Sequence, residues 1–163
     1  STVDGFPVLR ALRLVKSPLE VTRAKHACDI ASAAFALLPA KLEALRLTKR
    51  LLAGSEAVEV SVREARDAYR TLTLDLGADA TAYVMAQSGR GGYDNIVLEP
   101  GDAPLERGDV FIIDTGITFE GYWCDFDRNF IVGGAAQLSE AAAAAHDRLW
   151  LATEAGFAAA ARK

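Results

Sequence analysis

The sequence predicts an α+β fold in which helices cover one face of an antiparallel sheet. Apolar residues recur every three or four positions through the first half of the chain, as in amphipathic helices. Two β-prone stretches then flank a short Glu120-Gly121 connection, which is typical of an antiparallel hairpin. An alanine-rich stretch after Gly134 has high intrinsic helix propensity. The predicted order of elements is therefore helices, strands, helix.

The first helix is expected to begin after Ser17. Ser17 is suited to cap a helix, Pro18 fits the first helical position, and Glu20 completes a capping box. The apolar positions that follow recur at threes and fours and form one stripe: Leu19, Ala24, Ala27, Cys28, Ala31, Ala34, Phe35 and Leu38. Pro39 is expected to end or kink this helix.

Two more helical stretches are expected before the sheet. Residues 41–52 form the first, with Gly54 in the usual position after a helix end. Ser55 offers another cap, and residues 56–76 place charged and apolar residues at helical spacing up to Gly77. A period of two, typical of a strand, is also present in this stretch at Val58, Val60 and Val62.

The second half of the chain reads as sheet. Three β-prone stretches are expected to form strands: residues 81–87, 110–118 and 122–132. The glycine-rich residues 88–92 are expected to form a flexible loop, and without a following GKS or GKT they do not make a phosphate loop. Ser139 is expected to cap a last helix over residues 140–162.

Composition fits one soluble globular domain spanning residues 1–163. The chain has 51% hydrophobic and 25% charged residues and a formal net charge of -4, which argues against a nucleic-acid partner. No apolar run reaches the ~18 residues of a membrane span. The two cysteines form no CxxC motif and the start resembles no signal peptide, so we expect a reducing, cytoplasmic setting.

Three carboxylates are predicted to share one face of the hairpin. If Glu120 and Gly121 form the turn, residues whose numbers sum to 241 lie opposite each other, which pairs Asp114 with Asp127. Asp125 lies two residues before Asp127 and therefore points to the same side. Cys124 is offset by one residue and is expected to face the helices as a buried structural thiol.

Such a cluster needs compensation. Opposed side chains lie ~5 Å apart, and at that distance two unit charges repel by roughly 3 kcal/mol at an effective dielectric of ~20. Either protons are taken up or a divalent cation lies between the carboxylates. The alternative is that these are solvated charges at a sheet edge, one of them paired with Arg128.

The segment DTGITFEGYWCDFDR, residues 114–128, resembles the metal-binding hairpin of the creatinase, aminopeptidase P, prolidase and methionine aminopeptidase superfamily, which has the pita-bread fold. The matching positions are Asp114, Gly116, Gly121-Tyr122, Asp125 and Arg128. The LERGD and RLVKSPLE segments also resemble this family. The resemblance implies that residues 1–163 are the amino-terminal half of a pita-bread catalytic domain.

The resemblance also implies a site for two divalent ions, of Mn, Zn, Co or Fe, with an activated water as nucleophile. Asp114 would bridge or chelate one ion, and Asp125 would bridge both. The family completes this site with one His and two Glu from a second half of the domain, for which this chain offers no counterpart. His26 and His146 precede that region and are expected to be surface or packing residues.

Two departures from the peptidase pattern leave the substrate open. A His that peptidases place about ten residues before Gly108 is absent, because Val97 and Leu98 occupy that region. Tyr93, Asp94 and Asn95 supply polar groups instead, a pattern similar to dimethylsulfoniopropionate lyases. Peptidase relatives usually carry Thr where this chain has Asp127, so Asp127 is expected to be an additional metal ligand or to hold one in place.

The resulting expectation is a metal-dependent hydrolase of the Xaa-Pro peptidase type that acts on a small peptide or other small molecule. Tyr93, Asp94, Asn95 and Trp123, which shares the carboxylate face, are the expected substrate-binding residues. A lyase that cleaves a C–S bond and a non-catalytic peptide- or protein-binding module are the alternatives. The resemblance further implies a homodimer.

Overall fold

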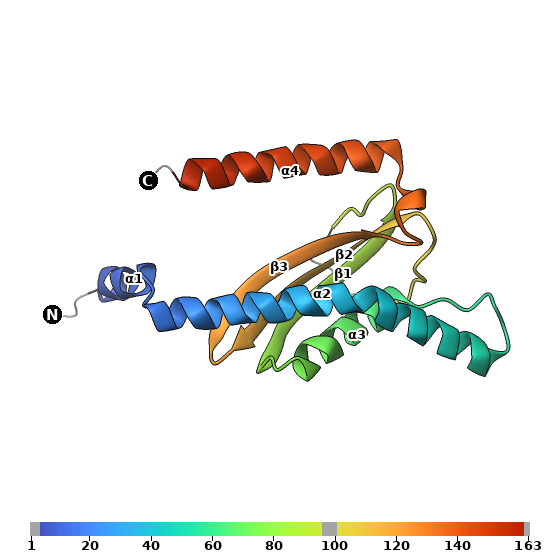
Figure 1. Ribbon diagram of the computed structural model, residues 1–163, viewed down its shortest axis with the longest axis horizontal. Helices are drawn as coiled ribbons and strands as arrows, with labels where there is room; N and C mark the ends of the chain where they lie inside the picture. Colours follow the sequence, from blue (N-terminus) through green and yellow to red (C-terminus); the bar gives the residue numbers. More distant parts are fainter. Residues whose placement is uncertain (1–3, 96–100, 162–163) are drawn as a thin grey trace.

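The computed structural model describes residues 4–95 and 101–161 and contains a three-stranded antiparallel sheet packed against helices (Figure 1). The strands are ordered β1-β2-β3 in the sheet. The elements are α1 (Phe6–Leu14), α2 (Pro18–Ala53), α3 (Val62–Asp75), β1 (Ala80–Arg90), β2 (Asp109–Phe119), β3 (Tyr122–Ile131), the short 3-10 helix η1 (Ala135–Gln137) and α4 (Glu140–Ala160). The predicted α+β class is confirmed.

The predicted start of α2 is confirmed. The Ser17 hydroxyl accepts a hydrogen bond from the Glu20 backbone N–H at 3.3 Å, and the Glu20 carboxylate accepts one from the Ser17 N–H at 2.7 Å. This reciprocal capping box satisfies two donors that a helix start leaves free. Gly54, with φ of 61°, ends the helix, and its N–H donates to the carbonyls of Arg50 and Leu51.

The prediction that Pro39 separates two helices is wrong. α2 runs without a break through Pro39, so residues 41–52 are its carboxyl-terminal part. Leu38 is 1% exposed, and Leu42 packs against the same core on the other side of the proline. Packing of this continuous apolar stripe outweighs the lost backbone hydrogen bond.

The predicted helix over residues 56–76 begins six residues too early. α3 starts at Val62, and its cap is Ser61, whose hydroxyl accepts from the Glu64 N–H at 3.2 Å. Before the helix, Val60 is 4% exposed and its carbonyl accepts from the Leu105 N–H at 2.8 Å. Residues 56–61 form no strand, but the Val60–Leu105 hydrogen bond and an isolated bridge between Ser61 and Pro104 join them to the chain before β2. Ser55 caps a turn rather than a helix.

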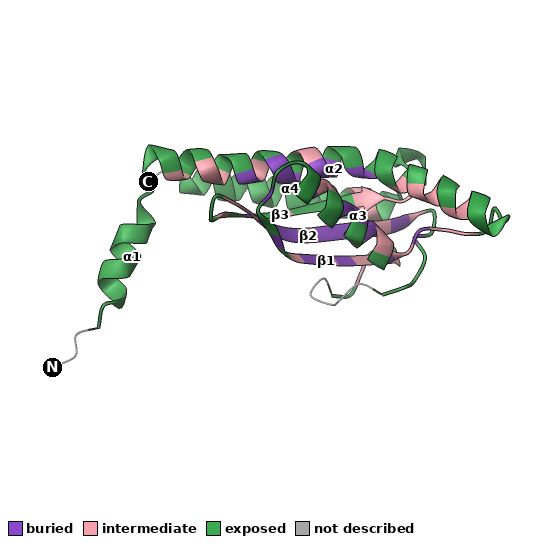
Figure 2. Cartoon of the chain, turned by 90° about the horizontal axis from the view of Figure 1, so that it is seen from below, coloured by how far each residue is buried: buried purple, intermediate pink, exposed green. Residues whose placement is uncertain are grey.

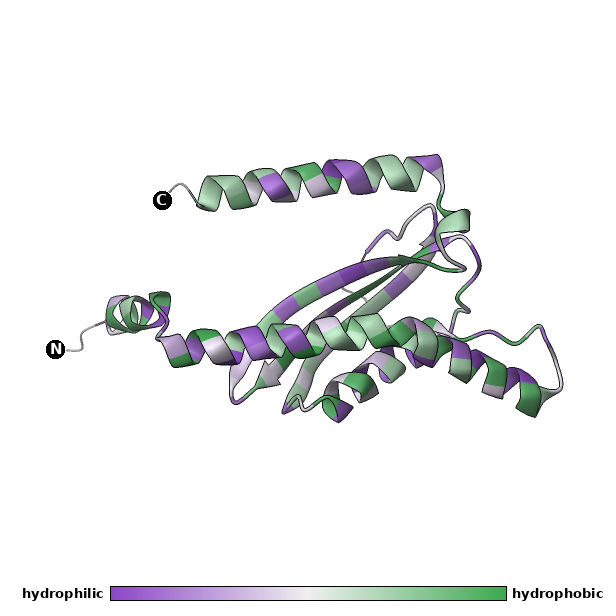
Figure 3. Cartoon of the chain, viewed as in Figure 1, coloured by the Kyte–Doolittle hydropathy of each residue, from purple (hydrophilic) through white to green (hydrophobic). Residues whose placement is uncertain are grey.

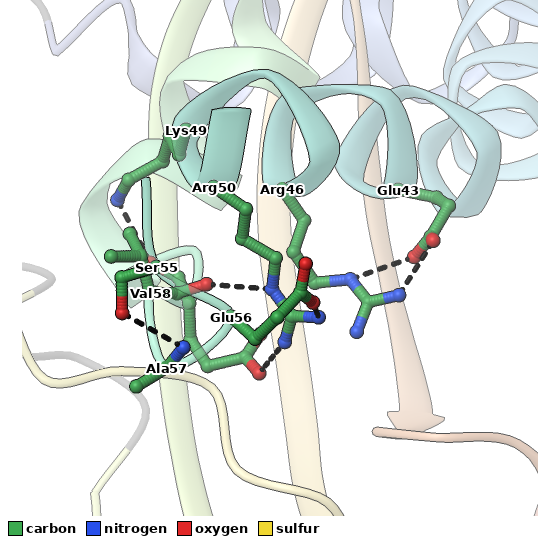
Figure 4. A network of polar contacts seen from close by, with 9 residues as sticks. Glu43, Arg46, Lys49, Arg50, Ser55, Glu56, Ala57 and Val58 are labelled. Atoms are coloured by element: carbon green, nitrogen blue, oxygen red, sulfur yellow. Dashed lines mark hydrogen bonds and ion pairs between the residues drawn. The ribbon is translucent and has the colours of Figure 1, made fainter. Parts of the chain in front are cut away.

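Charged side chains close the connection between α2 and α3 (Figure 4). The Arg50 guanidinium donates to the Val58 carbonyl at 3.0 Å and to the Glu56 carboxylate at 2.9 Å. Lys49 pairs with Glu64 at 2.6 Å, which ties α2 to the first turn of α3. These contacts fix the end of the long helix against the start of the next.

The core lies between the sheet and the two helices α2 and α3 (Figure 2). Its largest cluster is formed by Ala34, Phe35, Leu38, Val60, Val62, Ala65, Ala68, Tyr69, Val84, Ala86, Leu105, Phe111 and Ile113. A second cluster near the hairpin turn contains Ala27, Ile30, Ala31, Ala78, Ile117 and Cys124. Cys124 thus faces the helices, as predicted, and the opposite face of the sheet carries polar residues together with apolar ones such as Ile112 and Trp123.

The predicted last helix is confirmed as α4, which Ser139 caps. Its described residues are all accessible, including large apolar ones: Leu149, Trp150, Leu151 and Phe157. Figure 3 shows hydrophobic stretches along α4 and hydrophilic ones along β3. Among residues 4–95 and 101–161, no helix combines the length and the apolar character that a membrane crossing needs.

Candidate metal centre

The hairpin formed by β2 and β3 has the predicted register. Glu120 and Gly121 form its two-residue turn with φ of 47° and 78°, the left-handed values that a tight hairpin requires. Asp114 pairs with Asp127, and Gly116 pairs with Asp125. The Arg23 guanidinium holds the turn through the Glu120 carboxylate at 2.6 Å.

The three carboxylates lie on the sheet face opposite α2 and α3. Cys124 is 5% exposed within the second core cluster, and side chains alternate along a strand, so Asp125 and Asp127 point the other way. Both of these aspartates are exposed, whereas Asp114 is half-buried. The structure therefore confirms the shared face that the hairpin register predicted.

The electrostatics of the cluster follow from this geometry. The pKa of Asp114 is raised by burial first and then by the charges of Asp125 and Asp127. Arg128 does not relieve this repulsion with an ion pair among the described residues. Its guanidinium stacks over the Phe126 ring at 4.2 Å and donates to the Asp127 backbone carbonyl. The predicted alternative, in which Arg128 neutralises one carboxylate, is not what the structure shows.

Tyr83 is a site residue that the sequence did not indicate. It lies on β1, and its hydroxyl donates a hydrogen bond to Oδ1 of Asp125, two strands away, at 2.6 Å. Burial and this hydrogen bond raise the pKa of Tyr83, so the hydroxyl stays a donor. The bulge between Thr81 and Tyr83 shifts the register of β1 and sets Tyr83 opposite Gly116.

Gly116 makes room for this contact. A Cβ atom at position 116 would lie 2.4 Å from Cε1 of Tyr83, far inside van der Waals contact. The tyrosine ring therefore crosses β2 above the glycine to reach Asp125 on β3. Glycine at position 116 is therefore explained by the space that the Tyr83 ring occupies and not by a left-handed backbone conformation.

The predicted substrate-binding residues have different environments. Tyr93 is half-buried, and its hydroxyl donates to Oδ1 of Asn129 at 2.8 Å. The pKa of Tyr93 is raised by burial first and next by the Asp127 charge, which brings Tyr93 into the field of the carboxylates. Asp94 and Asn95 are exposed in the following bend.

Trp123 and Asn129 extend the carboxylate face along β3. Trp123 is 59% exposed, two residues before Asp125. Asn129, two residues after Asp127, was missed, although its strand parity was a signal for it. Positions 97 and 98, the region in which peptidases are expected to have a His, lie outside the described residues.

The carboxylates fit part of a metal site. Oxygen donors from one hairpin suit hard or borderline divalent ions. Burial, and after it the charges of Asp125 and Asp127, raise the pKa of Asp114, and a bound cation would favour the ionised carboxylate. In the described part of the chain, no group of three or more His, Cys, Asp or Glu side chains is arranged to hold an ion by itself. His26 packs on the Phe119 ring at 4.2 Å, and His146 is exposed on α4, as expected for packing and surface histidines.

Solved structures that share this fold include three peptidases. An X-Pro aminopeptidase from Thermotoga maritima matches with a TM-score of 0.73 and 23% identity over 91% of this chain and 37% of its own. The dipeptidase PepE from Mycobacterium ulcerans matches at 0.67 and 27%, over 85% of this chain and 33% of its own. A prolidase from Pyrococcus horikoshii matches at 0.61 and 27%, over 79% and 33%.

This chain thus spans about a third of the length of these structures, as half of a pita-bread fold does. A comparison with curated proteins finds no match. The sequence profile of metallopeptidase family M24 matches residues 22–163, which include α2 from its second turn, every later element and the whole carboxylate hairpin. The chain therefore belongs to metallopeptidase family M24.

Proposed function

We propose that the protein containing this chain is a metal-dependent hydrolase of the Xaa-Pro peptidase type. The observation that carries the proposal is the shared face of Asp114, Asp125 and Asp127 in a chain of family M24. Two of the structures matched at 27% identity are a dipeptidase and a prolidase, which supports a small peptide as the substrate. Homodimerisation is part of the same proposal.

In this proposal, Asp114 and Asp125 are ligands of two divalent ions, of Mn, Zn, Co or Fe. When bound, such ions supply Lewis-acid activation of water and of the substrate carbonyl. The hydrogen bond from Tyr83 fixes one oxygen of Asp125 and leaves the other free to bind. Asp127 adds a third carboxylate, as a ligand or as a neighbour that orients one. The resemblance to the family implies one His and two Glu as the remaining ligands.

Substrate contacts are proposed for Tyr93, Asp94, Asn95 and Trp123, of which Tyr93 lies in the field of Asp127 and Trp123 shares the carboxylate face. The hydrogen bond to Asn129 holds the Tyr93 ring against β3. Trp123 offers an exposed aromatic surface on the same side. These aromatic side chains lie toward the two ends of β3 and are suited to contact apolar parts of a small peptide.

One observation favours a second candidate, cleavage of a C–S bond in a sulfonium compound. The chain contains two histidines, His26 and His146, so the segment around Tyr93 has none to contact a peptide intermediate. Tyr93, Asp94 and Asn95 provide other polar groups there. The raised pKa keeps the Tyr93 hydroxyl protonated, so it is suited to donate a hydrogen bond to a substrate there.

The full-length protein, stripped with a chelator and reloaded with each of the four metals, distinguishes these functions. It is offered Ala-Pro, Ala-Ala and dimethylsulfoniopropionate. We expect metal-dependent cleavage of Ala-Pro, its loss in Asp125→Asn, and its retention in Asp29→Asn, a matched change at an exposed position paired with Lys25.

If only dimethylsulfoniopropionate is cleaved, the peptidase proposal is wrong and the lyase function is supported. Absence of turnover on all three substrates with every metal would contradict an enzymatic function of either kind. That result would favour the remaining alternative, a non-catalytic peptide- or protein-binding module.

A further inference from the structure

The two cysteines of the chain come from elements far apart in sequence and meet in one core cluster. Cys28 lies on α2 and packs against the cluster that contains Cys124 of β3. The Cys124 thiol donates to the carbonyl of Ala27, the residue before Cys28, at 3.6 Å across 97 positions of sequence. Both cysteines are free thiols.

The two thiols differ in their access to solvent. Cys124 is 5% exposed, whereas Cys28 is partly exposed. A small oxidant therefore reaches Cys28 first, and the Cys124 thiol belongs to the cluster against which Cys28 packs. Neither thiol lies on the carboxylate face, so the proposed hydrolysis does not use them.

We propose that Cys28 and Cys124 form a peroxide-sensitive dithiol that closes into a disulfide between α2 and β3. The Cys28 sulfur attacks one oxygen of hydrogen peroxide, the O–O bond breaks, and a sulfenic acid and one water form. The Cys124 sulfur then attacks the Cys28 sulfur, the S–O bond breaks, and a second water leaves with the Cys124 proton. In total, two thiols are oxidised and one peroxide is reduced to two waters.

Packing favours formation of the disulfide over further oxidation of Cys28. α2 and β3 hold the two sulfurs in one cluster, so the second step is intramolecular and has a high effective concentration. A sulfenic acid with a neighbouring thiol condenses to a disulfide before it reaches the irreversible sulfinic state. The new bond would fix β3 to α2 one residue from Asp125, from the face opposite the carboxylates.

Peptide mapping of the full-length protein tests this proposal. The protein is treated with hydrogen peroxide, its remaining thiols are blocked, and it is digested with trypsin without reduction. Cleavage after Lys25, Lys41, Arg107 and Arg128 gives peptides 26–41 and 108–128, each with one cysteine. We expect these two peptides to appear as one cross-linked species that a reductant separates.

Two variants serve as matched controls. In Cys28→Ser, peptide 108–128 should keep its free thiol under the same treatment. In Cys124→Ala, Cys28 should progress to the sulfinic acid, because no neighbouring thiol intercepts it. The proposal is overturned if wild-type protein yields both peptides as free thiols, a sulfinic Cys28 without the cross-link, or either cysteine joined to a different partner.

Discussion

The Tyr83 hydroxyl donates a hydrogen bond of 2.6 Å to Oδ1 of Asp125 by crossing the β2 strand above Gly116. This contact joins all three strands on the carboxylate face. It fixes the orientation of a proposed metal ligand that is otherwise exposed. Contacts that orient a ligand typically affect metal affinity strongly, so the pair Tyr83 and Asp125 gives the first prediction.

Tyr83→Phe should weaken metal binding by the full-length protein about 10–100-fold, the usual effect of removing a ligand's hydrogen-bond partner. The ring remains above Gly116, so thermal stability without metal should change little. Titration calorimetry measures the affinity. The matched control is Tyr122→Phe, which removes a hydroxyl that donates to Glu20 on the same hairpin. Equal affinities for the two variants would contradict the role of Tyr83.

Gly116→Ala should destabilise the protein by about 1–3 kcal/mol, the usual cost of overpacking. The added Cβ collides with the Tyr83 ring at 2.4 Å and displaces the hydroxyl from Asp125. Denaturant unfolding measures the loss. Gly156→Ala, at a helical glycine with nothing within 4 Å of the added carbon, is the control and should not destabilise. If Gly116→Ala destabilises the protein no more than Gly156→Ala does, the Tyr83 ring does not lie above Gly116 in solution.

The raised pKa of Asp114 predicts a pH-dependent stability of the metal-free protein. A carboxyl whose pKa is higher in the folded state than in the unfolded state makes the folded state bind more protons between the two values. Stability therefore falls as pH rises from the unfolded pKa of about 3.9 through the raised folded pKa, and it stays lowered above both.

Asp114→Asn removes this penalty and keeps an oxygen acceptor. With a chelator present, the variant should resist urea better than wild type near neutral pH, and the difference should shrink as the pH is lowered. Asp29→Asn on exposed α2 should show no such trend. A variant that is less stable than wild type at neutral pH would mean that burial and repulsion do not govern Asp114.

The identity of the α3 cap gives a further prediction. Ser61→Ala should cost about 1 kcal/mol of stability, because Ser61 accepts from the Glu64 N–H at the helix start. Ser55→Ala should cost clearly less, because Ser55 accepts only within a surface turn. Parallel urea titrations compare the two. A larger loss of stability in Ser55→Ala than in Ser61→Ala would support the earlier helix start that the sequence predicted.

These cases show which parts of the structure the sequence determines locally. The hairpin register was predictable because a two-residue turn at Glu120-Gly121 fixes every pair along both strands. Residues 56–61 were not predictable, because their charge spacing favoured a helix. The hydrogen bond that the Val60 carbonyl accepts comes from Leu105, which is distant in sequence.

The candidate site divides in the same way. Asp114, Asp125 and Asp127 lie on two strands joined by a short turn, so parity alone brings them together. Tyr83 lies on β1, whose register depends on a long connection and on the bulge beside Thr81. No local pattern fixes either feature, so the hydrogen bond to Asp125 became visible only in three dimensions.

Metal content of the full-length protein tests the central claim most directly. Elemental analysis of wild type, Asp125→Ala and the control Asp29→Ala, purified in parallel and dialysed against metal-free buffer, compares the bound ions per chain. The account predicts about two divalent ions in wild type and in the control, and loss of at least one in Asp125→Ala. Unchanged metal content in Asp125→Ala would contradict the assignment of the carboxylate face as a metal centre.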